Sequence, residues 1–235
     1  MDVIRWGGER LRVGPWRGDR SVAVMAPLPD APPPSAAFVR RCLGVLADRG
    51  FARVVTGALK PSEQPAFLQA GFAVAEELHV LTRRLDEVPP PPAVPGVRLR
   101  RSRRTERPEV LAVDHRSFRP FWQLDSPGLD DALAATPRAR LRVAVHSSGA
   151  LGGYAVIGRA GTRGYVQRLA ADPGWRRQGV GSALLLDGLR WLQRWGAAEA
   201  MVNTQTDNDG ALALYERHGF RRQPIGLRVL QSATT

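Results

Sequence analysis

The chain has 235 residues, 43% of them hydrophobic and 24% charged, a composition typical of globular rather than disordered proteins. No apolar run reaches the ~20 residues of a membrane span, the N-terminal residues lack the pattern of a signal peptide, and the single cysteine, Cys42, excludes an internal disulfide and indicates a reducing, cytoplasmic location. Arginine supplies nearly all of the positive charge, so the net charge of +12 is by itself weak evidence for a nucleic-acid partner.

A proline-rich linker at residues 89–96 divides the chain, because each proline ring fixes φ and removes a backbone hydrogen-bond donor. We expect a smaller domain at residues 1–88 and a larger one at residues 97–235. In chain order, the smaller domain is predicted to hold a strand at 21–28, a helix at 37–49, a strand at 52–58, a helix at 62–70 and a strand at 77–83.

The larger domain is predicted to begin with a strand and two helices and to continue with three strands joined by glycine-containing hairpin turns. A strand–helix alternation then ends the domain. The predicted ranges are a strand at 97–100, helices at 108–118 and 129–135, strands at 141–145, 151–157 and 165–170, a helix at 182–195, a strand at 201–204, a helix at 210–217 and a strand at 225–230. This order predicts a mixed α/β fold.

The most informative segment is Arg176-Arg177-Gln178-Gly179-Val180-Gly181-Ser182, which opens a leucine-rich helix. The two glycines let backbone amides approach a ligand closely. The first amides of a helix have no internal partners and lie at the positive end of its dipole. The segment is therefore a candidate site for phosphate oxygens, with a simple tight turn as the alternative.

A second motif, Asn208-Asp209-Gly210-Ala211-Leu212-Ala213-Leu214-Tyr215-Glu216-Arg217-His218-Gly219-Phe220, follows further along the chain. Together the two motifs resemble those of the GNAT superfamily of acyl-coenzyme A-dependent N-acyltransferases. That family carries Arg/Gln-x-x-Gly-x-Gly/Ala at its central helix and Asn-x-x-Ala-x-x-x-Tyr-x-x-x-Gly-Phe at its last helix. The resemblance covers roughly residues 97–230 and implies a GNAT fold, a central and mostly antiparallel sheet flanked by helices.

The resemblance implies acetyl-CoA as the default donor and a primary amine as the acceptor, which attacks directly through a tetrahedral intermediate. The donor-binding residues that it implies are Leu169, Ala170, Ala171, Arg176, Arg177, Gln178, Gly179, Val180, Gly181, Ser182, Asn208 and Tyr215. The strand at Leu169 would pair with the pantetheine arm and direct an amide at the developing oxyanion. Tyr215 would protonate the departing thiolate as general acid. The alternatives are a core tyrosine for Tyr215 and a helix cap for Asn208.

One feature of the family is missing from the strand before the phosphate loop. Many members carry a glutamate base there, whereas residues 164–169 include no carboxylate; Gln167 can orient a water but cannot take up a proton. The substitutes weighed are Asp114, His115, Asp125 and Glu199, each expected to be a surface or capping residue, and the base stays unassigned. The four histidines are widely spaced and lie beside no cysteine cluster, so no metal site is predicted.

The smaller domain resembles a degenerate, partial copy of the larger one. Leu43, Leu46 and Gly50 match Leu189, Leu192 and Gly196 at a constant offset, and both parts place Gly-Phe after their second helix. In the first copy Phe67 stands in place of Tyr215, and Pro32-Pro33-Pro34-Ser35 stands where the second copy has its glycines. The first copy is therefore interpreted as a lobe that supports the second; the alternative is coincidence.

Arginines are concentrated at the start of the larger domain, at Arg98, Arg100, Arg101, Arg103, Arg104 and Arg107. They would form a basic rim that steers an acidic acceptor, or a solvated surface. Phe118, Phe121 and Trp122 are candidates for an acceptor pocket or for core packing. Two other functions stay open: a regulator that binds acetyl-CoA without turnover, and a basic nucleic-acid-binding protein, for which no recognised motif is present. No membrane partner is expected. The acceptor, the acyl length and the oligomeric state, a homodimer included, are left open.

Overall fold

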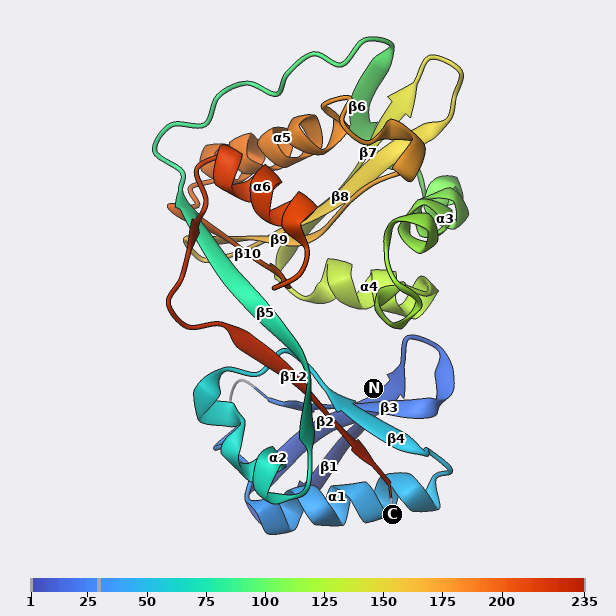
Figure 1. Ribbon diagram of the computed structural model, residues 1–235, viewed down its shortest axis with the longest axis vertical. Coiled ribbons are helices and arrows are strands. Elements are labelled where there is room, and N and C mark those ends of the chain that lie inside the picture. Colours follow the sequence, from blue (N-terminus) through green and yellow to red (C-terminus); the bar gives the residue numbers. More distant parts are fainter. Residues whose placement is uncertain (1, 29–30, 235) are drawn as a thin grey trace. The chain divides into compact units, whose positions relative to one another are not determined.

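The computed structural model describes residues 2–28 and 31–234, which form two compact units (Figure 1). Unit 1 is drawn from Met1–Val80, Thr204–Asn208 and Gln223–Thr235, and unit 2 from Leu81–Asn203 and Asp209–Arg222. The chain therefore leaves unit 1 within β5 (Ala73–Arg84) and returns to it twice.

Unit 1 is a mixed sheet with helices packed on one face. Its strands follow the order β1-β2-β3-β4-β12-β5. Their bounds are β1 Asp2–Trp6, β2 Glu9–Trp16, β3 Asp19–Pro27, β4 Arg53–Thr56 and β12 Leu227–Ala233, and the helices are α1 Ala36–Asp48, the 3-10 turn η1 Pro61–Glu63 and α2 Pro65–Gln69. The strands β3 and β4 run parallel, which the connection through α1 allows.

The core of unit 1 forms where the apolar face of its strands meets the apolar face of its helix α1. Leu11 and Val13 lie two residues apart on β2 and face the same side, where they meet Phe38 and Leu46 from α1. Cys42 is fully buried in this cluster, and burial raises the pKa of its thiol to about 12. The thiol therefore stays protonated at neutral pH and acts as a small core residue.

Two side chains, those of Ser35 and Glu9, cap the amino end of α1. The Ser35 hydroxyl accepts a hydrogen bond from the Phe38 amide at 3.2 Å. The Glu9 carboxylate in turn accepts hydrogen bonds from both the amide and the hydroxyl of Ser35. A carboxylate is favoured at this end of a helix because the dipole is positive there. The first lobe thus satisfies internally the helix end that corresponds to the glycine-rich segment of the second lobe.

The C-terminal strand β12 belongs to unit 1, which differs from the boundary expected at residues 97–235. It pairs antiparallel with β4, at Gln231 with Val55, and with β5, at Leu227 with Leu78. The Leu230 amide also donates to the buried Thr56 hydroxyl at 2.9 Å. Pairing on both edges, rather than position in the sequence, assigns this strand to unit 1.

Unit 2 is a sheet with helices on both faces, with the strand order β10-β9-β8-β7-β6. The strand bounds are β6 Val97–Arg101, β7 Arg138–His146, β8 Leu151–Ala160, β9 Arg163–Ala171 and β10 Glu199–Gln205, and the short β11, Arg221–Arg222, pairs with β5. The helices are η2 Arg104–Glu106, α3 Arg107–Ser117, η3 Pro120–Trp122, α4 Ser126–Ala134, η4 Pro173–Trp175, α5 Val180–Arg194 and α6 Asp209–Arg217. Only β9 and β10 run parallel among these neighbours.

Alternating side chains of β8 enter two separate cores. Ala155 and Ile157 pack in the cluster that α5 and α6 cover, whereas Tyr154 and Val156 pack in the cluster that α3 and α4 cover. A strand with both faces buried reads as a continuous apolar run, and β8 is buried over most of its length. The sheet is therefore the middle layer of a three-layer unit, with the long helix α5 beside β8 and β9 (Figure 1).

The proline tract is held against unit 2. Val88 and Val94, on either side of the prolines, are buried in the cluster that includes α5. Two side chains of α5 fix the preceding segment: Arg190 donates to the Val88 carbonyl, and Gln193 to the carbonyl of Leu85 at 2.8 Å. The tract expected to act as a linker is thus part of the surface of one unit.

The predicted mixed α/β class and the GNAT-like order of elements are confirmed by the structure. The predicted helices and strands are all present with shifted ends; the long helix, for example, begins at Val180 instead of Ser182. The strands β1 and β2 were missed. Their signal is a hairpin at Gly7-Gly8 followed by Leu11 and Val13 in alternation with arginines.

We predict that Leu230→Ala lowers the free energy of unfolding by about 2–5 kcal/mol, since a fully buried leucine loses its transfer energy and leaves a cavity. Ile225→Ala is the matched control in the same C-terminal segment, because Ile225 is 61% exposed and its loss should cost less than about 0.5 kcal/mol. Urea unfolding followed by circular dichroism measures both. Equal effects would mean that β12 is not part of the folded core.

Candidate active site

The strand β9 is the centre of the site because its two edges differ. On one side it pairs with β8 along its whole length, from Arg163 with Ala160 to Ala171 with Gly153. On the other side, the described pairing with β10 covers three positions and ends at Tyr165 with Met201. Residues 166–171 therefore have an edge that β10 does not use. An extended ligand can add to such an edge as a further strand.

A β-bulge lies at the start of this unpaired edge. Val156 on β8 is opposite Arg168, and Ile157 is opposite Val166, so that Gln167 has no partner across the strand pair. Bulges bend a strand, increase its twist and are frequent beside active sites. Here the bulge coincides with the stretch in which β9 leaves β10.

The segment between β9 and α5 combines a capped turn with left-handed residues. The Asp172 carboxylate accepts from the Gly174 amide at 3.0 Å and fixes the turn. Arg177 and Gly179 both have left-handed backbones, with φ of 62° and 88°. Amides that follow one another through left-handed and helical residues form a concave anion site.

The N-cap residue of α5 is a glycine, which has no side chain to cap the helix. Gly179 is the N-cap residue without a side-chain hydrogen bond, and the first helical bond runs from the Ala183 amide to the Gly179 carbonyl at 2.9 Å. The amides of Val180, Gly181 and Ser182 precede that bond and have no acceptor within the helix. This end contrasts with the filled end of α1.

The helix α6 lies beside the start of α5, which brings the two sequence motifs together. A Cβ on Gly181 would lie 3.4 Å from Leu214 Cδ2. Ser182 Oγ lies 2.9 Å from His218 Nε2. Glycine at position 181 therefore lets α6 approach and keeps its amide accessible.

Tyr215 of α6 is 5% exposed, and its ring packs 5.6 Å from that of Phe220. Burial raises the pKa of its hydroxyl, and the positive charge of Arg168 acts in the opposite direction. Tyr215 therefore keeps its proton at neutral pH. Arg168 directly precedes Leu169 on β9, so the pKa of Tyr215 responds to a charge on the strand whose edge β10 leaves unused.

Asn208 is the one predicted donor-binding residue outside unit 2. It lies in the segment Thr204–Asn208 of unit 1, directly before α6 begins at Asp209. The backbone N–H of Asn208 donates to the Gln205 carbonyl at 3.2 Å. The other predicted residues, from Leu169 to Ser182 and Tyr215, all lie in unit 2.

A buried ion pair joins β9 to α3 on the other face of the sheet. Asp114 is fully buried and accepts two hydrogen bonds from the Arg168 guanidinium, at 2.8 and 2.9 Å. Tyr154 on β8 donates its hydroxyl to the same carboxylate. The guanidinium also stacks over the Phe118 ring, 3.5 Å from its centroid, in a cation–π contact.

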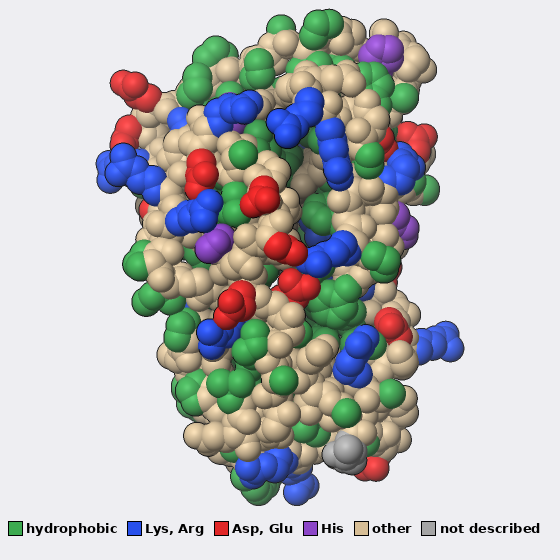
Figure 2. All heavy atoms as spheres, viewed as in Figure 1, with side chains coloured by type: hydrophobic (Ala, Val, Ile, Leu, Met, Phe, Trp, Pro, Cys, Tyr) green, Lys and Arg blue, Asp and Glu red, His purple; other side chains and the backbone are tan. Residues whose placement is uncertain are grey.

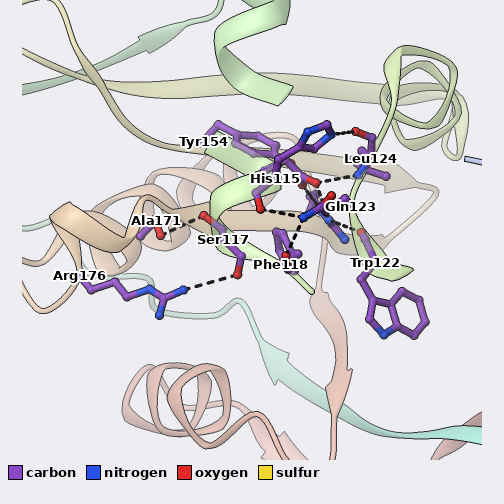
Figure 3. A network of polar contacts seen from close by, with 11 residues as sticks. His115, Ser117, Phe118, Trp122, Gln123, Leu124, Tyr154, Ala171 and Arg176 are labelled. Atoms are coloured by element: carbon purple, nitrogen blue, oxygen red, sulfur yellow. Dashed lines mark hydrogen bonds and ion pairs between the residues drawn. The ribbon is translucent and has the colours of Figure 1, made fainter. Parts of the chain in front are cut away.

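Polar contacts hold the connection between α3 and α4, and Trp122, Gln123 and Leu124 take part in them (Figure 3). The Leu124 amide donates to Asp114 at 2.7 Å, and Arg168 donates to the Trp122 carbonyl at 2.6 Å. The Gln123 side chain closes the loop by donating to the His115 and Phe118 carbonyls. Residues 118–124 are therefore positioned by side chains of β9 and α3.

Comparison with known proteins identifies this arrangement. The model of the Acetyltransferase (GNAT) family matches residues 107–220. A mycothiol acetyltransferase of Saccharopolyspora erythraea is 32% identical over 177 residues, 71% of this chain and 56% of that protein. The mycothiol acetyltransferase of Salinispora arenicola is 32% identical over 210 residues, 79% of this chain and 67% of that protein. The chain belongs to the GNAT acetyltransferase family.

The solved structures extend the likeness to both units. A tandem GNAT protein from the clavulanic acid biosynthesis pathway superposes with a TM-score of 0.72, at 16% identity, over 99% of this chain and 82% of that one. Both units therefore have a GNAT-like fold, as the internal repeat predicted. The chain spans just over half the length of the Saccharopolyspora relative.

Within this GNAT fold, three of the residues weighed as a substitute base have other contacts, namely Asp114, Asp125 and His115, and the fourth, Glu199, lies at the start of β10. Asp114, expected at the surface or as a cap, is instead fully buried in the ion pair, because it shares one face of α3 with the buried Val110 and Val113. Asp125 caps α4 through the Gly128 amide at 2.7 Å, as expected of a capping residue. The His115 ring lies 2.7 Å from the Leu124 carbonyl. Gln167 donates to the Thr136 hydroxyl at 3.2 Å.

The predicted basic segment lines a cavity of about 620 Å³ beside β6, with β7 and β8 between it and β9. Arg98, Arg100, Arg103 and His146 contribute, together with Glu106 and Glu109. Arg100 forms an ion pair with Glu106, whose pKa it lowers to about 2. Figure 2 shows basic and acidic side chains interspersed on the visible face, without one continuous basic surface.

Over residues 2–28 and 31–234, no helix is long and apolar enough to cross a membrane. Over the same part of the chain, no group of three or more His, Cys, Asp or Glu side chains is placed to hold a metal ion.

We predict that Asp114→Asn destabilises the protein by about 3–5 kcal/mol, because it leaves the charge of Arg168, whose side chain is 11% exposed, without its buried counter-ion. The matched control is Asp130→Asn, which removes a more exposed carboxylate from its ion pair with Arg107 and should cost no more than about 1 kcal/mol. Chemical denaturation measures both. A loss at Asp114 as small as that at Asp130 would contradict the anchoring role.

Proposed function

We propose that the protein transfers an acetyl group from acetyl-CoA to a primary amine at the unpaired edge of β9. One observation carries the proposal: the edge at residues 166–171 leads through residues 172–179 to the open amino end of α5. A ligand for the strand edge needs an extended arm with amide groups, and a ligand for the amino end of α5 needs a pyrophosphate. Coenzyme A has that chemical order.

The chain's residues fit such a donor. The backbone of Leu169, Ala170 and Ala171 would pair with the arm, and the backbone from Arg176 to Ser182 would surround the pyrophosphate. The left-handed backbone at Gly179 strains any other residue, and a side chain at Gly181 would crowd Leu214. Asn208 is proposed as a further contact of the arm, on the strength of its motif alone.

Acetyl-CoA supplies an acetyl thioester, which a neutral primary amine attacks. Within the chain, the Leu169 amide is proposed to donate to the oxygen on which negative charge develops. Tyr215 holds a proton at its hydroxyl because its pKa is raised, and it would deliver that proton to the leaving sulfur. Residues 164–169 include no carboxylate to act as base, so the amine is proposed to arrive already neutral. The proton that its nitrogen loses as the amide forms is proposed to pass to solvent, from which Tyr215 regains the proton given to the sulfur.

The acceptor is proposed to approach the connection between α3 and α4. Phe121 and Trp122 form an edge-to-face pair with centroids 5.1 Å apart, and Phe118 is fixed beneath Arg168. These rings offer an apolar wall that the ion pair of Asp114 and Arg168 positions. The names of the relatives make the acceptor of the mycothiol acetyltransferases the first amine to test.

The direct experiment is release of free thiol from acetyl-CoA in the presence of a panel of amines, with mass spectrometry of the acetylated product. Release that requires an amine supports the transferase. Binding of acetyl-CoA without release for any amine would favour the regulator, for which the missing carboxylate of β9 is the argument.

We predict that Gly181→Asp weakens acetyl-CoA binding at least about tenfold, because a carboxylate would lie where the amides receive the pyrophosphate. Isothermal titration calorimetry measures the Kd. Gly181→Ala controls for the close approach of Leu214, and Gly44→Asp on α1 controls for the added charge at a position with open space. Unchanged affinity in Gly181→Asp would remove the pyrophosphate from this site.

Tyr215→Phe keeps the ring and removes only the hydroxyl. We expect kcat to fall about 10²-fold, the scale of general acid catalysis, while the Kd for acetyl-CoA stays within about twofold. Steady-state kinetics and calorimetry measure the two separately. A parallel loss of binding would assign Tyr215 to packing, and full activity would assign the proton to another group.

A further inference from the structure

His218 follows the end of α6, and its ring reaches the first turn of α5. Its Nε2 atom lies 2.9 Å from Ser182 Oγ. Ser182 is the third residue of α5, and side chains of a helix lean toward its amino end. The Ser182 hydroxyl therefore lies on the side of the open amides. Through this one hydroxyl, His218 contacts the proposed pyrophosphate site, although the mechanism above gives it no role.

The direction of the hydrogen bond depends on the tautomer and on the charge of the ring, and the inference concerns the neutral tautomer that carries its proton on Nδ1. A neutral imidazole with its proton on Nδ1 accepts the Ser182 hydroxyl hydrogen at Nε2, so this hydrogen cannot reach a ligand. An imidazolium carries hydrogens on both nitrogens and must donate from Nε2 to Ser182 Oγ. The hydroxyl hydrogen then turns away from the ring and can bind a phosphate oxygen.

The surroundings favour the neutral ring as long as no anion is bound. Burial lowers the pKa of His218, and the positive charges of Arg83 and Arg217 lower it further. Arg83 comes from β5 and donates to the His218 carbonyl at 2.5 Å, and Arg217 precedes His218 on the chain. The positive end of the α5 dipole acts in the same direction. A pyrophosphate at the α5 amides would offset these fields with negative charge.

We propose that His218 is a positioning residue that couples donor binding to the uptake of a proton. When pyrophosphate binds at the amides of Val180, Gly181 and Ser182, the ring takes one proton from solvent, and the Ser182 hydroxyl becomes an additional phosphate donor. This inference rests on the proposed function, because it needs the pyrophosphate at α5. Its consequence is that donor affinity rises as pH falls through the range in which the ring titrates.

The test is calorimetric titration with dephospho-CoA, which has the pyrophosphate but no phosphate monoester that titrates near neutral pH. Titrations in two buffers of different ionisation enthalpy give the number of protons taken up. We expect a fraction of one proton near neutral pH, and a Kd about three- to tenfold lower at about pH 6 than at about pH 8.

Two variants and one control make the assignment specific. His218→Gln should abolish the proton uptake and flatten the pH dependence while binding persists. Ser182→Ala should flatten it as well, and it carries the test if the histidine variant fails to fold. His79→Gln, the same change on β5 in unit 1, should retain the full dependence of the unaltered chain.

The possible failures are distinct. Lack of binding by the unaltered chain to both acetyl-CoA and dephospho-CoA would overturn the proposed function. Binding with equal proton uptake in the unaltered chain and in His218→Gln or Ser182→Ala would leave that function standing and overturn the role of His218.

Discussion

The site depends on the short pairing of β9 with β10. Because the described pairing covers three positions, β9 has one edge paired with β8 and another, at residues 166–171, that β10 does not use. On this stretch the Ser117 hydroxyl donates to the Ala171 carbonyl at 3.2 Å. An unpaired strand inside a sheet is costly unless something uses its hydrogen bonds. The bulge at Gln167 lies at the same place, and residues 172–179, which include η4, lead from the strand to the amino end of α5. The geometry of β9 thus determines where the proposed donor site lies and along which strand edge it runs.

The second constraint is the ion pair of Asp114 and Arg168 on the opposite face of that strand. A buried pair contributes little net stability, since desolvation offsets the attraction between the charges. Its effect here is geometric: the two side chains bind the Leu124 amide, the Trp122 carbonyl and the Tyr154 hydroxyl, and so fix a connection that has little regular structure. The backbone of β9 is therefore the part proposed to bind acetyl-CoA. Its Arg168 side chain positions the aromatic residues that are proposed to contact the acceptor.

Local motifs made much of this fold predictable from the sequence. The glycines at 179 and 181 and the pattern ending in Gly219-Phe220 identify the family, the long helix and the residues expected at the donor site. Asp114 was misjudged, although Val110, Val113 and Asp114 lie at helical spacing on one face, which indicates a buried carboxylate. Its partner was not predictable, because nothing local in the sequence pairs a residue of α3 with one on β9.

The same limit applies to β12 and to the filled end of α1. The proline tract suggested a boundary because prolines disfavour regular structure, but a strand joins whichever sheet has an edge for it. Glu9 and Ser35 are 26 residues apart, and their contact follows from the hairpin β1–β2, which was not predicted. Long-range pairing, and not local propensity, accounts for each of these differences.

The place of β12 between β4 and β5 has a consequence for the order in which the protein folds during synthesis. Most of unit 1 precedes unit 2 along the chain, yet its sheet stays open at β4 until residues 227–233 have been made. Closing so long a loop carries an entropic cost that local contacts must first offset. Unit 2 is complete earlier, at Arg222, so the lobe translated first is the one that finishes last. Until then, the edges of β4 and β5 that later pair with β12 keep unpaired backbone groups, to which another strand can add.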